Sequence, residues 1–239
     1  MKGPALVALL ALACASQSDL NVLYNRGIKA ARRDHWEVAM KDLSQFTSWT
    51  CWKASPDRRC REAYLALGRG HERAGAPASA WASYDRALAL PPHERDAVVQ
   101  ESLARAQQQV VDKLQQGERG PVVIRYRDEM PDEYTLRSVV ISIDFQPVVT
   151  RDKNAAELHS PDFAQVFASS LPAGQHVLLV ETQHACKTGQ DVPCTRSATH
   201  RAFAFDSVAR TPTTLELRGY ADLAESGVPA VPTATMTTR

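Results

Sequence analysis

Cysteine is the residue type in this chain whose spacing points most directly to chemistry. Four of the five cysteines form two close pairs, Cys51 with Cys60 and Cys186 with Cys194, and the fifth, Cys14, follows an apolar run near the N-terminus. Close pairs of this kind are typical of disulfides in exported proteins, which fold in an oxidising environment. We therefore predict two disulfides, Cys51–Cys60 and Cys186–Cys194. The first is expected to add about 2–3 kcal/mol of stability by closing a short loop.

A zinc site is the alternative for the second cysteine pair. His184 and His200 lie near Cys186 and Cys194 in the sequence and complete a set of four zinc-binding side chains. Zinc would need all four within about 2.3 Å of one point. Their spacing is not that of a zinc finger, and export favours a disulfide. We expect no bound metal.

No pattern of catalytic residues stands out among the other polar side chains. None of the seven histidines lies in a recognisable nucleophile motif with Ser or Cys, and no phosphate-binding loop, dinucleotide fingerprint or zinc-protease motif occurs. The acidic segment 128–133 offers calcium ligands as an alternative, but its carboxylates lack the regular spacing of a calcium loop. We interpret it as a solvated linker, and we predict no enzymatic activity and no cofactor.

The first 15 residues predict an export signal. Lys2 supplies a positive start, and residues 5–13 form an apolar run too short to span a bilayer. The stretch Ala11-Leu12-Ala13-Cys14 resembles a bacterial lipoprotein signal, although the residues two and three places before the cysteine are not the usual ones. The resemblance implies a lipid on Cys14 and, because Ala15 rather than Asp follows, a place on the periplasmic side of the outer membrane.

Two other interpretations of this segment stay open. Ala13-Cys14-Ala15 also fits an ordinary signal-peptidase site. Cleavage there leaves Ser16 first and gives a soluble periplasmic or secreted protein. The third alternative is a buried helix of a cytosolic protein. Lipidation of Cys14 has the advantage of accounting for the odd cysteine.

Composition divides the rest of the chain into two domains and a tail. The net charge is +1, and neither half has the excess of basic residues expected of a nucleic-acid-binding protein. Apolar residues recur at helical spacing before residue 118, and β-branched runs separated by prolines follow it. We predict a helical domain over 16–118, a strand domain over 119–223 and a disordered tail rich in Pro, Thr and Ala over 224–239.

The helical half predicts two helical hairpins and a fifth helix, at 20–33, 35–49, 61–74, 77–90 and 96–114. Asp34 is expected to cap the second helix. Residues 61–92 resemble a tetratricopeptide repeat, on the residues Tyr64, Leu67, Gly68, Ala80, Tyr84, Ala87 and Pro92. Gly68 and Ala80 are small where the two helices of the repeat cross. Residues 20–49 match less closely, with Arg26 in an apolar position, and we interpret them as a degenerate first repeat.

The tetratricopeptide resemblance implies a concave face that binds a peptide or helix of a partner protein. By repeat geometry, the residues of this partner-binding groove are Tyr24, Arg61, Leu65, Arg69 and Glu72. The alternative is that this face packs against the strand domain, and the sequence does not decide between the two.

The second half predicts a small antiparallel β-sandwich, with strands at 122–127, 139–145, 148–150, 175–182, 201–205 and 213–217. Ser160 is expected to cap a short helix over 163–168. Segments 141–148 and 171–178 resemble a PEGA-type envelope β-sandwich, although Phe145 stands where that family has Gly.

These expectations define a two-domain α+β protein: all-α tetratricopeptide-like hairpins followed by an antiparallel β-sandwich. Two binding modules without catalytic residues predict an envelope lipoprotein that acts as a protein–protein interaction adaptor or scaffold in a secretion, motility or surface assembly. The alternative is cell-wall or carbohydrate binding by the sandwich, which would need exposed aromatic residues among Tyr126, Tyr134, Phe163 and Phe167. The partner's identity and the oligomeric state are left open.

Overall fold

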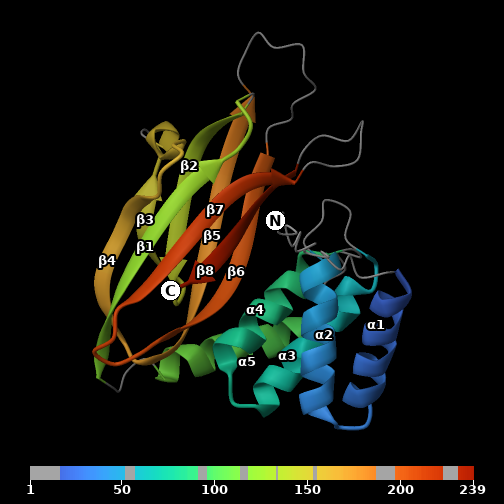
Figure 1. Cartoon of the computed structure of the whole chain (residues 1–239). Helices are drawn as coiled ribbons and strands as arrows, with labels where there is room; N and C mark the ends of the chain where they lie inside the picture. The colour runs from blue at the N-terminus through green and yellow to red at the C-terminus, as the bar shows by residue number, and fades with distance from the viewer. Residues whose placement is uncertain are drawn as a thin grey trace, which may run out of the picture.

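The part of the chain that the structure describes contains five α-helices followed by eight strands (Figure 1). The computed structural model describes residues 17–51, 57–90, 96–113, 118–132, 134–152, 155–186, 197–222 and 231–239. The helices are α1 (Gln17–Ala31), α2 (Trp36–Thr50), α3 (Cys60–Arg73), α4 (Pro77–Leu88) and α5 (Ala97–Lys113). The strands are β1 (Arg119–Glu129), β2 (Tyr134–Ile143), β3 (Gln146–Arg151), β4 (Ala164–Pro172), β5 (Gly174–Cys186), β6 (Ser197–Ser207), β7 (Thr213–Asp222) and β8 (Val231–Thr238), with a 3-10 helix η1 (Ala155–Leu158) before β4. We call 17–113 the helical region and 118–239 the strand region.

Two similar turns separate the helices of the first and second pairs. Asp34, after α1, has φ 59°, and Gly75, after α3, has φ 67°. A residue in this left-handed conformation commonly ends a helix. The prediction that Asp34 caps α2 is therefore wrong: the residue before α2 is His35, which makes no side-chain cap. The Asp34 carboxylate instead accepts a hydrogen bond from Trp36 Nε1 at 3.1 Å.

Small residues let α3 and α4 approach closely. A Cβ atom added at Gly68 would lie 2.4 Å from Cε1 of Tyr84, and Ala80 on α4 is fully buried. The ring of Tyr84 has little room to move, because it is 2% exposed and its hydroxyl donates to Glu72 at 2.7 Å. The helix crossing thus depends on glycine at position 68, for the steric reason expected from the sequence.

Gly68→Ala is expected to lower the free energy of unfolding by about 1–3 kcal/mol, because the methyl group overpacks the crossing and outweighs the better helix propensity of alanine. Gly70→Ala, in the same helix, is the matched control. Its Cβ would meet Cγ of Met40 at 2.8 Å. Because the methionine side chain is flexible and can move aside, this variant should lose less. Chemical denaturation of both variants checks the prediction, and equal losses would contradict it.

A disulfide joins α2 to α3. The predicted Cys51–Cys60 bond is present, and Cys60 is fully buried. Arg26 stands at a position where the tetratricopeptide pattern has an apolar residue. Its guanidinium pairs with the buried carboxylate of Asp42 on α2. Cys14 and Cys194 lie outside the described residues, and so does the predicted Cys186–Cys194 bond.

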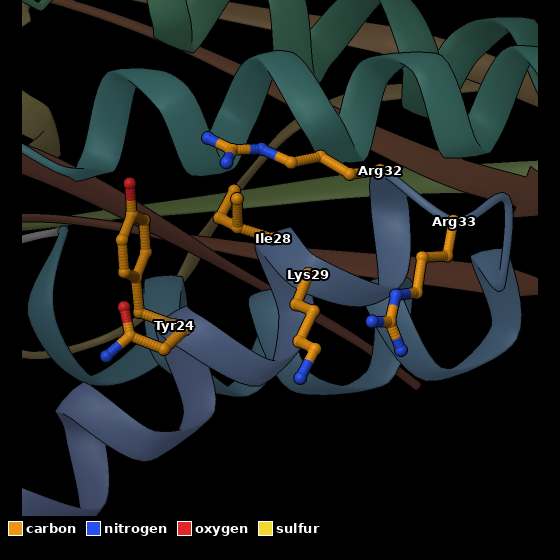
Figure 2. A pocket seen from close by; sticks show the side chains of 6 residues that line it. Tyr24, Ile28, Lys29, Arg32 and Arg33 are labelled. Carbon is orange, nitrogen blue, oxygen red and sulfur yellow. The ribbon is translucent and has the colours of Figure 1, made fainter.

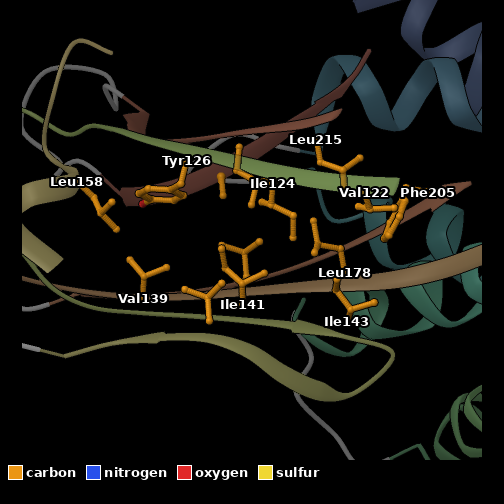
Figure 3. Close-up of a cluster of buried hydrophobic side chains, with 14 of the residues drawn as sticks. Val122, Ile124, Tyr126, Val139, Ile141, Ile143, Leu158, Leu178, Phe205 and Leu215 are labelled. Carbon is orange, nitrogen blue, oxygen red and sulfur yellow. The ribbon is translucent and has the colours of Figure 1, made fainter. Parts of the chain in front are cut away.

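The described strands of the strand region form two four-stranded sheets, ordered β4-β1-β7-β8 and β3-β2-β5-β6. Their facing sides enclose one hydrophobic cluster (Figure 3). Val122, Ile124 and Tyr126 alternate along β1 and face this cluster, as the period-two pattern of a half-buried strand requires. The expectation of a wholly antiparallel sandwich is wrong at one pair, since β1 and β7 run parallel.

Three local predictions in the strand region are also wrong. Residues 164–172 form β4 rather than a helix, because they pair with β1 in the register Ile124↔Phe167. Residues 231–238 of the predicted disordered tail form β8, an edge strand on β7. Phe145 does not continue β2: it lies in the turn to β3 with φ 69°.

The helical region packs on the outer face of the second sheet, mainly through α4 against β5 and β6 (Figure 1). Trp81 on α4 meets Phe145 with the ring centroids 4.9 Å apart. Val177 and Ala202 complete the contact, and both are fully buried. None of the described helices is both long and apolar enough to cross a membrane.

Candidate interaction sites

Two of the predicted groove residues line a depression between α1 and α3. Leu65 and Arg69 of α3 face Ile28 and Arg32 of α1 across a volume of about 290 Å³. We call this depression the α1–α3 groove and define it by Ile28, Arg32, Glu62, Leu65, Ala66 and Arg69. Ile28, Leu65 and Ala66 give it an apolar floor, so an apolar side chain of a partner would find contacts there.

Tyr24 lies beside this groove on α1. It lines a second depression of about 410 Å³ with Ile28, Lys29, Arg32 and Arg33. Figure 2 shows Tyr24 and Arg32 pointing toward the neighbouring helix, with Lys29 and Arg33 pointing the other way. The Tyr24 hydroxyl donates to Glu62, and burial together with Glu62 raises the pKa of Tyr24 to about 12. Tyr24 is therefore a neutral hydrogen-bond donor at physiological pH, and it holds the side chain of Glu62, which lines the groove.

The other two predicted groove residues tie helices together instead. Glu72 accepts the hydroxyl proton of Tyr84 at 2.7 Å and pairs with Arg105 of α5 at 3.1 Å. Arg61 lies 3.7 Å from Asp96 at the start of α5, with its side chain 18% exposed. Neither residue lines either depression.

The strand region packs on a different side of the helices from the α1–α3 groove. Its most extensive contacts are made by α4 and α5, whereas α1 lies at the far side of the helical region (Figure 1). Within the described residues, the groove is therefore open. Arg32 and Arg69 are exposed at its edges, and Glu62, the acidic residue among those that line it, lies 3.4 Å from Nη2 of Arg32. The surface has more positive than negative groups.

The proposed zinc ligands His184 and His200 point to opposite faces of their sheet. His184 is buried between the sheets, where its Nε2 lies 3.1 Å from Oδ1 of Asp128. His200 faces α4, where its Nε2 lies 3.2 Å from Asp85. One metal ion cannot bind both side chains. No group of three His, Cys, Asp or Glu residues in the described part of the chain could hold a metal.

Asp128, from the segment considered for calcium, is bound by two histidines. Its buried carboxylate lies 3.1 Å from Nδ1 of His159 and 3.1 Å from Nε2 of His184. Burial and the charge of Asp128 raise the pKa of Tyr126 well above its usual value. With both carboxylate oxygens engaged by imidazoles, Asp128 ties β1, β5 and the segment before β4 together.

His176 also has a structural role. Its Nδ1 lies 2.6 Å from Asp144 and its Nε2 lies 2.8 Å from the carbonyl of Pro172. A ring that donates from both nitrogens has none left to accept a proton, so it cannot act as a general base.

Most of the aromatic residues considered for carbohydrate binding are not displayed on a sheet face. Tyr126 and Tyr134 are buried, and Phe167 packs against the hydrophobic core. Phe163 is in contact with two guanidiniums, with the Cζ atom of Arg127 4.6 Å and that of Arg218 5.3 Å from its ring centroid. Together these four residues do not form the stacking platform that sugar binding would need.

A larger cleft, which the sequence did not indicate, lies at the junction of the two regions. It has a volume of about 600 Å³, and its walls come from α2, α3 and α4 on one side and β6, β7 and β8 on the other. We call it the junction cleft and define it by Tyr64, His71, Arg86, Arg201, Phe203 and Tyr220. Its two arginines are far apart in the chain, and only the packing of the two regions brings them together.

The fold is of the α+β class: in the described residues, five α-helices precede two four-stranded sheets, with the α1–α3 groove on the helices and the junction cleft between the two regions. No family model matches the chain, and no curated protein matches it.

Proposed function

We propose that this protein is an exported lipoprotein of the cell envelope that acts as an interaction adaptor, binding a partner protein through the α1–α3 groove. The observation that carries the proposal is the position of the groove, which is open within the described residues while the strand region packs on α4. In this proposal α1 to α4 are two tetratricopeptide-like hairpins, α5 is a capping helix, and the strand region is a PEGA-like β-sandwich.

Two features of the helices support the tetratricopeptide-like interpretation. The turns at Asp34 and Gly75 repeat one left-handed backbone geometry at equivalent places. Gly27 against Leu43 and Gly68 against Tyr84 repeat one close contact between the helices of each pair. Hairpins that repeat in this way stack and leave one side of the array for a partner.

The chemistry of the groove indicates the kind of segment it binds. The floor of Ile28, Leu65 and Ala66 suits an apolar anchor. The exposed guanidiniums of Arg69 and of Arg32, which keeps further N–H donors beside its contact with Glu62, suit acidic neighbours. Arginine pairs well with carboxylates because its planar group donates two parallel hydrogen bonds. The proposed partner segment is therefore a helix or peptide with an apolar side chain flanked by Asp or Glu.

Charge reversal in the groove is expected to abolish partner capture. The double variant Arg32→Glu and Arg69→Glu should lose an envelope partner that the wild-type protein captures from gently solubilised membranes, as quantified by mass spectrometry. The matched control is Arg137→Glu with Arg151→Glu, two exposed arginines of the strand region, which should keep the partner. Equal capture by both double variants, or recovery of cell-wall fragments alone, would contradict the proposal.

The membrane tether is tested separately. The mass of the mature N-terminus distinguishes an acylated Cys14 from cleavage before Ser16. A protein that starts at Ser16 would remove the tether from the proposal and leave the adaptor function in place.

A further inference from the structure

The junction cleft has the size and composition of a small-molecule site. Ligand pockets in proteins commonly have volumes of about 300–1,000 Å³ and apolar walls with a few polar groups. The junction cleft, at about 600 Å³, lies within this range. Its apolar lining includes Leu67, Leu90 and Phe203, and its polar lining includes Tyr64, Arg86 and Arg201.

The charge of the cleft is one-sided. Arg86 and Arg201 line it, and none of the described residues that line it is Asp or Glu. Burial and the nearby charge of Arg86 both lower the pKa of Arg201. Tyr64, Tyr220 and Asp85 act on the pKa of Arg201 in the opposite direction, and Asp85 itself is not part of the cleft lining. Two like charges sharing a half-buried cleft are stabilised by an anion between them.

Arg86 is held in position before any ligand arrives. Its Nη2 donates to the carbonyl of Ala202 at 2.8 Å, which is a contact from α4 to β6. Its guanidinium carbon lies 5.8 Å from the ring centroid of Tyr64 and 5.6 Å from that of Phe203. A guanidinium has five N–H donors in a fixed plane. The one used for Ala202 orients the group, and the fork suits an oxyanion.

His71 adds a neutral polar group to the same wall. Burial lowers the pKa of His71, so the ring is uncharged at neutral pH and can donate or accept a hydrogen bond. Together with the aromatic faces of Tyr64 and Phe203, it favours a ligand that has a planar or apolar part beside its charge.

We propose that the junction cleft binds a small organic anion, with its oxyanion group held by Arg86 and Arg201 and its apolar part against Tyr64 and Phe203. The oxyanion is a carboxylate or a phosphate, since the arginine fork recognises both. Because the walls belong to both regions, the bound anion also ties the helical region to the strand region. The site is separate from the α1–α3 groove and does not depend on it.

Titration of the full-length chain with three matched probes tests this site. Benzoate and phenyl phosphate carry the two oxyanions on the same ring, and benzyl alcohol is the neutral counterpart. We expect at least one anion to bind with a Kd below about 1 mM, to shift the side-chain Nε–Hε NMR signals of Arg86 and Arg201, and to bind more weakly as salt is added. The tighter of the two identifies the oxyanion. The absence of saturable binding by both anions, or equal binding of benzyl alcohol, would overturn the proposal.

A variant then assigns the binding to the cleft. Arg201→Gln should weaken anion binding by about tenfold or more, because it removes one of two charged forks. Arg137→Gln, at an exposed position on β2, should bind as the wild type does. Unchanged affinity in Arg201→Gln would overturn the assignment. If this variant does not fold, the NMR shifts in the wild-type protein decide: shifts confined to signals outside the cleft overturn it equally.

Discussion

Replacing Asp144 with alanine is expected to lower the free energy of unfolding by about 3–5 kcal/mol, because it leaves a buried imidazole without its counter-charge. The His176 side chain is fully buried, and its Nδ1 lies 2.6 Å from Oδ2 of Asp144. The other carboxylate oxygen accepts the backbone N–H of Val177 at 2.9 Å. The alanine variant therefore loses two hydrogen bonds at the turn between β2 and β3.

The same pair makes stability depend on pH. Burial alone would lower the pKa of His176, but the hydrogen bond and charge of Asp144, with the carbonyl of Pro172, raise it overall. A histidine with a raised pKa in the folded state stabilises fully below its unfolded pKa of about 6.5 and loses that contribution as pH rises through the folded pKa. The wild-type free energy of unfolding should therefore fall as pH increases from about 6.5.

The variant Asp144→Asn removes the negative charge of the side chain but keeps its size and its ability to form hydrogen bonds. The carboxamide can donate to Nδ1 of a neutral His176, whose Nε2–H still donates to Pro172, so the loss should be only about 1–2 kcal/mol. Burial then lowers the pKa of His176, and stability is lost as pH falls instead of as it rises.

Denaturation of the wild-type protein and both variants at several pH values measures these effects. His200 also has a raised pKa, caused by Asp85 and Glu181, and it adds the same slope to all three proteins, so the difference from wild type is the quantity to compare. Asp162→Ala, at an exposed site, is the control and should change stability by less than about 0.5 kcal/mol. An asparagine variant with the wild-type pH slope would show that His176 is not charged in the fold.

The helices could be predicted from the sequence because their signals are local. Apolar spacing placed all five, and the small size of Gly68 anticipated the contact with Tyr84. Asp34 was assigned the wrong role because the same residue type favours both an N-cap and a left-handed helix end. In the structure, the turn that joins α1 to α2 places Asp34 in the left-handed conformation, so it ends α1 and does not cap α2.

The strands were harder to predict because their partners are distant. Ser160-Pro161-Asp162 is a typical helix start, yet the following residues pair with β1 in the register Val122↔Ser169. The Thr-rich segment at the C-terminus has few apolar residues, but it pairs antiparallel with β7 as β8, where Met236 lies opposite Leu217. In both segments, pairing with a strand already in place outweighed the local signal.

The two candidate sites differ in the same way. Repeat geometry located Leu65 and Arg69 in the α1–α3 groove, because that groove is built within one helical region. Repeat geometry wrongly put Arg61 and Glu72 in the groove. Arg61 pairs with Asp96 and Glu72 pairs with Arg105, and both contacts depend on where α5 packs. The junction cleft needs both regions in contact, and no local pattern encodes the meeting of Arg86 with Ala202.

Replacing Trp81 with alanine should uncouple the two regions. Trp81 is 6% exposed, and its ring meets Phe145 with the centroids 4.9 Å apart. Truncating a buried tryptophan costs about 3–5 kcal/mol. The polar contacts that remain include Arg86 to Ala202, His200 to Asp85 and Gln175 to Ser79, and hydrogen bonds of these kinds are worth about 0.5–3 kcal/mol each. We expect one unfolding transition of the wild-type protein to become two, one for each region.

Calorimetry of Trp81→Ala and Trp49→Ala checks this expectation. Trp49 is 39% exposed on α2, so its truncation removes a ring of the same type without touching the junction and should leave a single transition. The junction cleft supplies a second readout, because an anion that contacts both regions binds only while they are docked. Anion affinity should therefore fall in Trp81→Ala even though this variant keeps both arginines. A single transition of unchanged midpoint in Trp81→Ala would mean that the regions are held together by contacts other than this ring.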